Sequence, residues 1–203
     1  MPFRITVMPV MAVEDCVATG RYDAVLAVMP ESECSDLFPW PDVGSVPRVV
    51  VAVSDLGRRR PLTEAQVAAV KASGQSVVLP DPSHARAIVE FGRRAEAEGW
   101  RSVLVHCHAA VSRSPAAALI LAAMQDGPGR EAESAERVSR MSPFCDFAPN
   151  MTLVGFADDL LGRGGALSAA CVERFYAVEY AVEYDDELGR RGIQVERPSP
   201  AAP

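Results

Sequence analysis

The sequence predicts an α/β protein with a central, mostly parallel sheet flanked by helices and a helical C-terminal half. Three observations predict this class. Short runs rich in valine and isoleucine alternate with helical patterns in the first half of the chain. The continuous apolar run at 102–106 is typical of a strand that is covered on both faces, as in parallel sheets. The second half carries helical patterns alone, and strands with helices followed by such a block indicate a layered fold.

Four segments are predicted strands, because each is a short apolar run bounded by turn residues. They are residues 4–10, 23–29, 48–54 and 102–106. A short helix that ends at Gly20 fits between the first two strands. The Pro- and Ser-rich residues 30–47 predict a loop.

Six longer helices are predicted from periodicity and from their end signals. Thr63 is suited to cap a helix over 63–74, and Pro82 stands near the start of a longer helix over 81–99. The other four helices are residues 114–125, 129–141, 151–162 and 166–189, with a loop over 142–150. We expect residues 1–190 to form a single domain and residues 191–203 to be a disordered tail.

Composition limits the kinds of partner. With 203 residues, 49% of them hydrophobic, the chain is long enough to bury one substantial core. The net charge of −7 argues against a nucleic-acid surface, which needs a basic excess, but it leaves room for one local anion site. No apolar run approaches the roughly 18 residues of a membrane span, so no membrane contact is expected. Glu14 and Asp15 follow the first apolar run early, which favours a strand there over a signal peptide.

The five cysteines are widely spaced and form no C-x-x-C pair. An odd number at such spacings argues against a disulfide framework and favours a reducing, cytoplasmic setting. Four of them are expected to be small buried apolar residues, the usual fate of a free cysteine. These are Cys16, Cys34, Cys145 and Cys171. Cys107 has neighbours of a different kind.

Cys107 stands at the end of the strand 102–106, just before a run of mostly small residues and a helix. The strand delivers the cysteine to the carboxyl edge of the sheet, where crevices form in α/β folds. The backbone N–H groups of the short run can curl around one centre, and the following helix adds its positive N-terminal end. Arg113 contributes a planar fork that matches two oxygens of a phosphate. Such a cradle suits a tetrahedral dianion, and it favours the thiolate form of Cys107, which is a nucleophile.

The pattern H-C-x5-R-[ST] is present as His106, Cys107, Arg113 and Ser114. It resembles the loop of the cysteine-dependent protein tyrosine phosphatase superfamily. The dual-specificity version, H-C-x-A-G-x-S-R-S, is matched at every specified position except one, where Ala110 replaces glycine. Because that glycine eases a backbone turn that alanine resists, the departure predicts either lowered activity or a loop that adapts at a cost of about 1–2 kcal/mol.

The resemblance continues downstream of the loop. Residues 137–163 carry R, S-P, P-N and A-D-x-L-L-G-R in an order that is similar to the compact bacterial tyrosine phosphatases. The resemblance covers roughly residues 45–170 and is looser in the N-terminal third. It implies a bacterial phosphatase-like fold with a helical half after the loop, and a reaction that needs neither metal nor other cofactor.

The resemblance also implies a role for each loop residue. Cys107 attacks phosphorus and forms a cysteinyl-phosphate, while Arg113 and the backbone amides of the loop hold the equatorial oxygens. Ser114 assists the departure of the thiolate, and His106 fixes the setting of the cysteine through hydrogen bonds. The phosphate-binding residues are then His108, Ala109, Ala110, Val111, Ser112 and Arg113.

The family also uses an upstream aspartic acid to protonate the leaving oxygen, and two residues are candidates. Asp55 follows the strand 48–54, as the family's acid does in the bacterial group, where F-x-D-[IL] is usual. Asp81 lies nearer to Cys107 in sequence, but it begins a helix, and N-capping explains its presence equally well. We favour Asp55, which makes residues 57–80 an insertion relative to the bacterial pattern.

Three functions compete. The first is hydrolysis of phosphotyrosine or a similar phosphomonoester, on a phosphorylated protein or a small molecule. The second is a pseudophosphatase that binds a phosphorylated partner or an anion without efficient turnover. The third, another cysteine-loop fold, is disfavoured because Cys107 lies mid-chain and is followed by a helical half. A metal site at 106–108 is disfavoured because neighbouring strand residues point to opposite faces.

One basic cluster has two interpretations. Arg58, Arg59 and Arg60 form either a solvated turn or part of the mouth of the pocket, where they would attract an acidic substrate. The sequence leaves the physiological substrate and the oligomeric state open.

Overall fold

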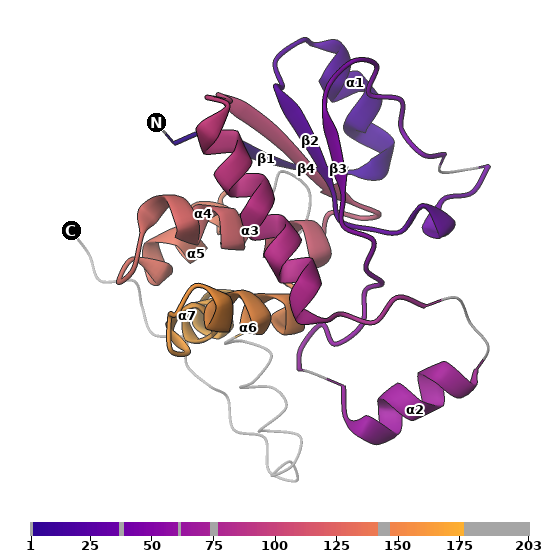
Figure 1. Ribbon diagram of the computed structural model, residues 1–203, viewed down its shortest axis with the longest axis vertical. Coiled ribbons are helices and arrows are strands. Elements are labelled where there is room, and N and C mark those ends of the chain that lie inside the picture. Colours follow the sequence, from indigo (N-terminus) through magenta and orange to yellow (C-terminus); the bar gives the residue numbers. More distant parts are fainter. Residues whose placement is uncertain (1, 37–38, 61, 74–76, 142–146, 177–203) are drawn as a thin grey trace, which may run out of the picture.

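The structure is a computed structural model, and it describes residues 2–36, 39–60, 62–73, 77–141 and 147–176. Within these residues one four-stranded sheet lies between helices (Figure 1). Every strand pair is parallel, and the strand order is β1-β4-β2-β3. The strands are β1 (Arg4–Pro9), β2 (Ala24–Ala27), β3 (Arg48–Val50) and β4 (Ser102–Cys107). The predicted fold class, a mostly parallel sheet with a helical C-terminal half, is therefore confirmed.

Strand β4 lies inside the sheet, and all six of its residues are buried. Val105 lies between Val7 of β1 and Leu26 of β2. Because the strands are parallel, their carboxyl ends meet at one edge, where Pro9 is opposite Cys107. The sheet thereby places the last residue of β4 at the edge from which its loop departs.

Strand β3 is shorter than predicted. The predicted strand spans residues 48–54, whereas β3 ends at Val50. The Val51 N–H still donates to the Ala27 carbonyl at 2.8 Å. Beyond that point the chain leaves the sheet. The Val53 carbonyl accepts a hydrogen bond from Arg113, and Ser54 pairs with Val78. Residues outside the sheet thus take the hydrogen bonds that would have extended the strand.

Helices cover both faces of the sheet (Figure 1). Helix α1 (Val13–Ala18) packs on the face that Leu104 shares with a small apolar cluster. Helices α3 (Pro82–Ala97) and α4 (Arg113–Asp126) cover the opposite face, where Val103 and Val105 join the main core. The alternation of these residues follows the two-residue period of a strand.

Helix α4 is the buried axis of the helical half, and its side chains from Arg113 to Ala123 are all buried. Three further helices complete this half: two pack directly on α4, and the last of the three packs on those two (Figure 1). They are α5 (Glu131–Ser139), α6 (Met151–Leu160) and α7 (Ala166–Phe175). Arg137 donates to the Ala122 carbonyl and Arg163 donates to the Ala123 carbonyl, so two arginines cap the end of α4. The predicted extension of the last helix to residue 189, and the predicted tail, lie outside the described residues.

Helix α2 (Glu64–Ala72) stands away from this body (Figure 1). Thr63 caps it in a capping box with Gln66, as the sequence predicted for Thr63. The helix has no buried residue. We call residues 62–73 the α2 arm. Ser54 and Val78 lie on either side of the α2 arm in the sequence, and two hydrogen bonds join them.

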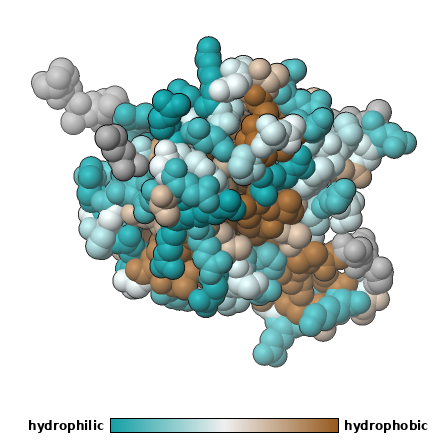
Figure 2. Space-filling model, turned by 45° about the horizontal axis from the view of Figure 1, so that its top comes forward, coloured by the Kyte–Doolittle hydropathy of each residue, from teal (hydrophilic) through white to brown (hydrophobic). Residues whose placement is uncertain are grey.

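The predicted burial of the cysteines is confirmed only in part. Cys107 and Cys171 are buried, whereas Cys16 and Cys34 are only half-buried; all four are free, and Cys145 lies outside the described residues. No helix in the described part of the chain is long and apolar enough to span a membrane. The face drawn in Figure 2 is largely hydrophilic, with apolar residues in smaller patches.

Candidate active site

Cys107 ends β4 and Arg113 begins α4, so the residues between them form a short connection that we call the cysteine loop, residues 107–113. Neighbouring segments hold three of its carbonyl groups from outside. Val10 donates to the His108 carbonyl at 3.1 Å, and Ala148 donates to the Val111 carbonyl at 2.8 Å. The Ser112 carbonyl accepts from Asn150 at 3.1 Å. Carbonyl groups held outward are what a loop needs if its amide groups are to face an anion.

Ala110 adopts a left-handed backbone conformation, with φ of 57°. It is the one non-glycine residue with positive φ among the described residues. Its side chain is buried in the main core. The loop thus makes the turn that glycine usually makes, at a conformational cost of about 1–2 kcal/mol.

Ser114 contacts the cysteine directly. Its hydroxyl group donates to Cys107 Sγ at 3.1 Å, and both side chains are buried. Ser114 lies in the first turn of α4, so the helix start places the hydroxyl group under the sulfur. A hydrogen bond donated to sulfur stabilises a thiolate, because it is made to the charged form.

Arg113 is buried, and a carboxylate holds one side of its guanidinium group. Glu33, which lies in the short 3-10 helix η2 (Glu31–Glu33), accepts from Nη1 at 2.8 Å and from Nη2 at 2.7 Å. Nη1 also donates to the Val53 carbonyl at 2.9 Å. The Nε atom is buried and has no partner among the described residues. A guanidinium group has five N–H bonds, so Nε–H and the second Nη2–H remain as a fork for two further oxygens.

Glu33 was not predicted as a site residue, because it is 80 positions from Arg113 and lies in the segment predicted as a plain loop. One signal was available. Glu33 follows closely after β2, and the carboxyl ends of parallel strands share an edge. An acidic residue just beyond a strand that neighbours β4 is therefore a candidate partner for the loop arginine.

Asp55 lies against the cysteine loop. Its Oδ1 atom accepts from the Ser112 hydroxyl at 2.6 Å and from Asn150 Nδ2 at 3.3 Å. Its Oδ2 atom is 3.7 Å from Arg58 Nη2. The structure thus brings Asp55 to the predicted site through contacts with two residues that also touch or belong to the loop.

Asp81 is placed differently. It is the N-cap of α3, and its side chain is 56% exposed. The Ser83 N–H donates to Asp81 Oδ1 at 2.7 Å, and His84 completes the capping box. The hydrogen bond from the Ser83 hydroxyl group is the main reason why the pKa of Asp81 lies below its ordinary value. The local contacts of Asp81 are those of a helix cap.

Asn150 ties Asp55 to the cysteine loop. Its side chain donates to Asp55 and to the Leu56 carbonyl, and it accepts from Leu153, so it also caps α6. We call residues 55–58 the acid segment. Thr152 donates to the Gly57 carbonyl at 2.8 Å. Gly57 has positive φ, and a Cβ atom there would lie 2.3 Å from Thr152 Oγ1, so this close approach requires glycine.

His106 lies on the face of β4 opposite Cys107, because neighbouring strand residues alternate. It is fully buried, and its ring packs edge-on to Trp40 with centroids 6.1 Å apart. Neither ring nitrogen makes a hydrogen bond of standard geometry to the described residues. Burial, and then the positive charge of Arg48, lower the pKa of His106 to about 4, although a weaker hydrogen-bond interaction with the Cys107 backbone acts to raise the pKa of the ring. The ring is therefore neutral at neutral pH.

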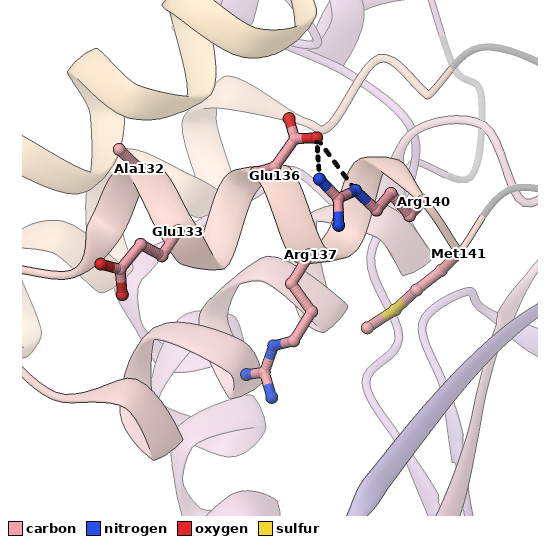
Figure 3. Close-up of a pocket in the computed structure, with 6 residues that line it drawn as sticks. All are labelled: Ala132, Glu133, Glu136, Arg137, Arg140 and Met141. Atoms are coloured by element: carbon pink, nitrogen blue, oxygen red, sulfur yellow. Dashed lines mark hydrogen bonds and ion pairs between the residues drawn. The ribbon is translucent and has the colours of Figure 1, made fainter. Parts of the chain in front are cut away.

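A hollow of about 760 Å³ on the outer side of α5 is a second place to consider (Figure 3). Its charged lining residues are paired with neighbours. Glu136 binds Arg140 and Arg174, and Arg137 binds Asp126. It contains none of the predicted site residues. We therefore place the candidate active site at the cysteine loop.

Comparisons with known proteins agree with this placement at the level of fold. No protein-family model and no curated protein sequence matches the chain. Solved structures do match. The human tyrosine phosphatase-like serine/threonine/tyrosine-interacting protein has a TM-score of 0.55 and 16% identity, covering 78% of this chain and 91% of that one. A mutant form of Tk-PTP has a TM-score of 0.52 and 18% identity, covering 79% and 91%. A variant of human DUSP28 has a TM-score of 0.52 and 16% identity, covering 78% and 92%.

The chain therefore has the fold of the cysteine-dependent protein tyrosine phosphatase superfamily, as the cysteine-loop pattern predicted. Identities of 16–18% establish the fold alone. The chemistry has to be argued from the residues of the site.

Proposed function

We propose that the protein is a cysteine-dependent phosphatase that hydrolyses phosphotyrosine or a similar phosphomonoester through a cysteinyl-phosphate. The observation that carries this proposal is the arrangement around Arg113. Glu33 and the Val53 carbonyl hold one end of the guanidinium group, and the buried Nε side is left for two oxygens. Cys107, with Ser114 at its sulfur, ends the strand that leads into the same loop. A nucleophile and an oxyanion fork on one loop are the minimum equipment for this reaction.

The first step transfers the phosphoryl group to sulfur. The Cys107 thiolate attacks phosphorus in line with the ester bond, a P–S bond forms, and the bond to the leaving oxygen breaks. Asp55 gives its proton to that oxygen, and Oδ2 is suited to carry the proton because Oδ1 accepts two hydrogen bonds. Arg113 and the amides of residues 108–113 hold the three equatorial oxygens while charge builds on them.

The second step releases phosphate. A water molecule attacks phosphorus, Asp55 takes up its proton, and the P–S bond breaks to return the thiolate. Ser114 donates to Cys107 Sγ and so stabilises the sulfur as it leaves. In this scheme His106 supports the cysteine from the other face of β4 by packing, as a neutral ring. The substrate is a phosphorylated protein or a small phosphomonoester, and the scheme uses no cofactor.

A second function, phosphate binding without efficient turnover, is favoured by two observations. Ala110 makes the loop turn in a conformation that is unfavourable for alanine. Asp55 is tied to Ser112, Asn150 and Arg58, and these contacts favour a carboxylate that stays in place. One solved structure with this fold is itself described as phosphatase-like and interacting.

The test is hydrolysis of an aryl phosphate by the full chain, across pH and with a chelator present. We expect turnover that Cys107→Ser lowers by at least about a thousandfold. We expect Asp55→Asn to lower it by roughly a hundredfold or more, whereas Asp81→Asn is the matched control and changes little, because asparagine also caps helices well.

Two outcomes would contradict the proposal. If the folded wild-type protein shows no turnover, the proposal that it is a phosphatase is wrong. Binding of a phosphotyrosine peptide by that protein would then support the second function. Turnover that survives in Cys107→Ser excludes the cysteinyl-phosphate.

A further inference from the structure

The arginine run Arg58–Arg60 belongs to the acid segment at one end and leads toward the α2 arm at the other. All three residues are exposed. The mechanism proposed above uses none of them, so their role is a separate question. They stand out in a chain whose net charge is −7, because that net charge disfavours acidic partners overall.

The run is adjacent to the cysteine loop through a short chain of contacts. Arg58 Nη2 is 3.7 Å from Asp55 Oδ2, and Asp55 Oδ1 accepts from the Ser112 hydroxyl at 2.6 Å. Ser112 directly precedes Arg113. One aspartate therefore separates the first arginine of the run from the loop that would hold the phosphate.

The start of the run is also fixed in place. The Arg58 carbonyl accepts from the Met151 N–H at 2.7 Å and from the Tyr176 hydroxyl at 3.4 Å. The Gly57 carbonyl, one residue earlier, accepts from Thr152. These bonds join the run to the start of α6 and to Tyr176, the residue that follows α7. Since a residue spans at most about 3.6 Å, Arg60 Cα lies within roughly 7 Å of Arg58 Cα. The backbone of all three arginines therefore lies close to the contact between Arg58 and Asp55.

We infer that the arginine run binds acidic side chains that flank the phosphorylated residue, so that the preferred substrate is an acidic phosphopeptide. This inference rests on the proposed function for the phosphate itself. Three exposed guanidinium groups in sequence suit several carboxylates spread along an extended chain. The cysteine loop has no lysine, and a single compact headgroup would engage fewer of the three arginines.

The experiment compares two phosphotyrosine peptides of equal length, one flanked by Asp and Glu and the other by Asn and Gln. The measured quantity is the ratio of their kcat/KM values. We expect wild type to prefer the acidic peptide by roughly threefold to tenfold, because exposed charge pairs each contribute little. The double variant Arg59→Gln/Arg60→Gln should bring the ratio close to one, and added salt should do the same in wild type.

The matched control is Arg21→Gln/Arg101→Gln, which removes the same charge at the opposite edge of the sheet. Both residues are exposed and precede β2 and β4 at their amino ends. The control should keep the wild-type ratio. A loss of preference in the control as well as in the test variant would mean that net charge, and not the run, is responsible, and would overturn the inference.

The failure of this inference can be told apart from the failure of the phosphatase proposal. Aryl phosphate has no flanking residues, so turnover with it reports on the cysteine loop alone. If wild type is inactive on aryl phosphate, fluorescence anisotropy of the two labelled peptides on Cys107→Ser still measures the preference. A ratio near one in wild type overturns the inference, as does faster hydrolysis of vesicles that contain a phosphoinositide than of the acidic peptide.

Discussion

The cysteine loop and the α2 arm are built on opposite plans, although the acid segment that contacts the loop ends only a few residues before the arm begins. Around the loop, the side chains of Cys107, Arg113 and Ser114 are buried and each has a polar contact. Along the arm, helix α2 has no buried residue and is held by its own capping box. The difference teaches that the strained backbone of Ala110 and the buried charge of Arg113 are kept where many contacts hold them, and that the arm is an addition with little effect on them.

Among the changes that test this comparison, the largest effect is expected from Glu33→Gln, which breaks the pairing at Arg113. The variant leaves the guanidinium group without its charged partner, so the direction of Arg113 is fixed less firmly, with the Val53 carbonyl still accepting from Nη1. Since Glu33 is 28% exposed, we expect a loss of about 1–3 kcal/mol in unfolding free energy, less than for a fully buried pair. We expect kcat/KM to fall roughly tenfold to a hundredfold.

Chemical denaturation and aryl phosphate kinetics measure both effects. Glu31→Gln is the matched control, because it removes the same charge two residues away at an exposed position. Equal behaviour of the two variants would show that Glu33 does not position the arginine.

The second effect concerns His106 and pH. Its pKa in the folded protein is about 4, below the ordinary value of 6.5. Above pH 6.5 the ring is neutral in both the folded and the unfolded protein. Between pH 6.5 and 4 the unfolded chain binds the proton and the folded protein does not, so stability falls as pH falls, by about 3 kcal/mol in total.

The difference between wild type and His106→Phe isolates this contribution from that of the carboxylates. Denaturant titrations at pH 7.5 and pH 4.5 give the two unfolding free energies for each protein. We expect the phenylalanine variant to lose less stability on acidification. An identical loss in both proteins would contradict the assignment of a low pKa to His106.

A smaller effect is expected from Ala110→Gly. Glycine relieves the left-handed strain of about 1–2 kcal/mol, but the change also removes a buried methyl group worth roughly 0.8 kcal/mol. We expect a net stabilisation of about 0.5 kcal/mol, seen as a slightly higher Tm. Ala109→Gly, at the neighbouring loop position without positive φ, should instead lower the Tm. The reverse order would mean that Ala110 is not strained.

The smallest effect is expected in the arm. Replacing residues 62–75 by a short Gly-Ser linker removes a helix that buries nothing and keeps the Ser54–Val78 pairing. Loop-closure entropy changes slowly with length, so unfolding free energy should change by less than about 1 kcal/mol. Aryl phosphate turnover should be kept. A loss of several kcal/mol would show that the arm supports the body after all.

The sequence predicted the parts of the site that lie close together along the chain. Cys107, Arg113 and Ser114 share one strand-loop-helix unit, and their order alone indicates an anion site. The contribution of Glu33 was missed because nothing local links it to a residue 80 positions away. The extent of β3 was overestimated because propensity cannot show that Arg113 takes the Val53 carbonyl. Tertiary contacts decided both outcomes.

The long reach of the site contacts has a consequence for the order of folding. The partner residues are 80 positions apart for Arg113 and Glu33, 57 for Ser112 and Asp55, and 95 for Asn150 and Asp55. Contacts between such distant positions must close large loops before they return any free energy, so they form slowly. Helical signal should therefore recover early after dilution from denaturant, while the closed site, and any activity that depends on it, returns in the last phase.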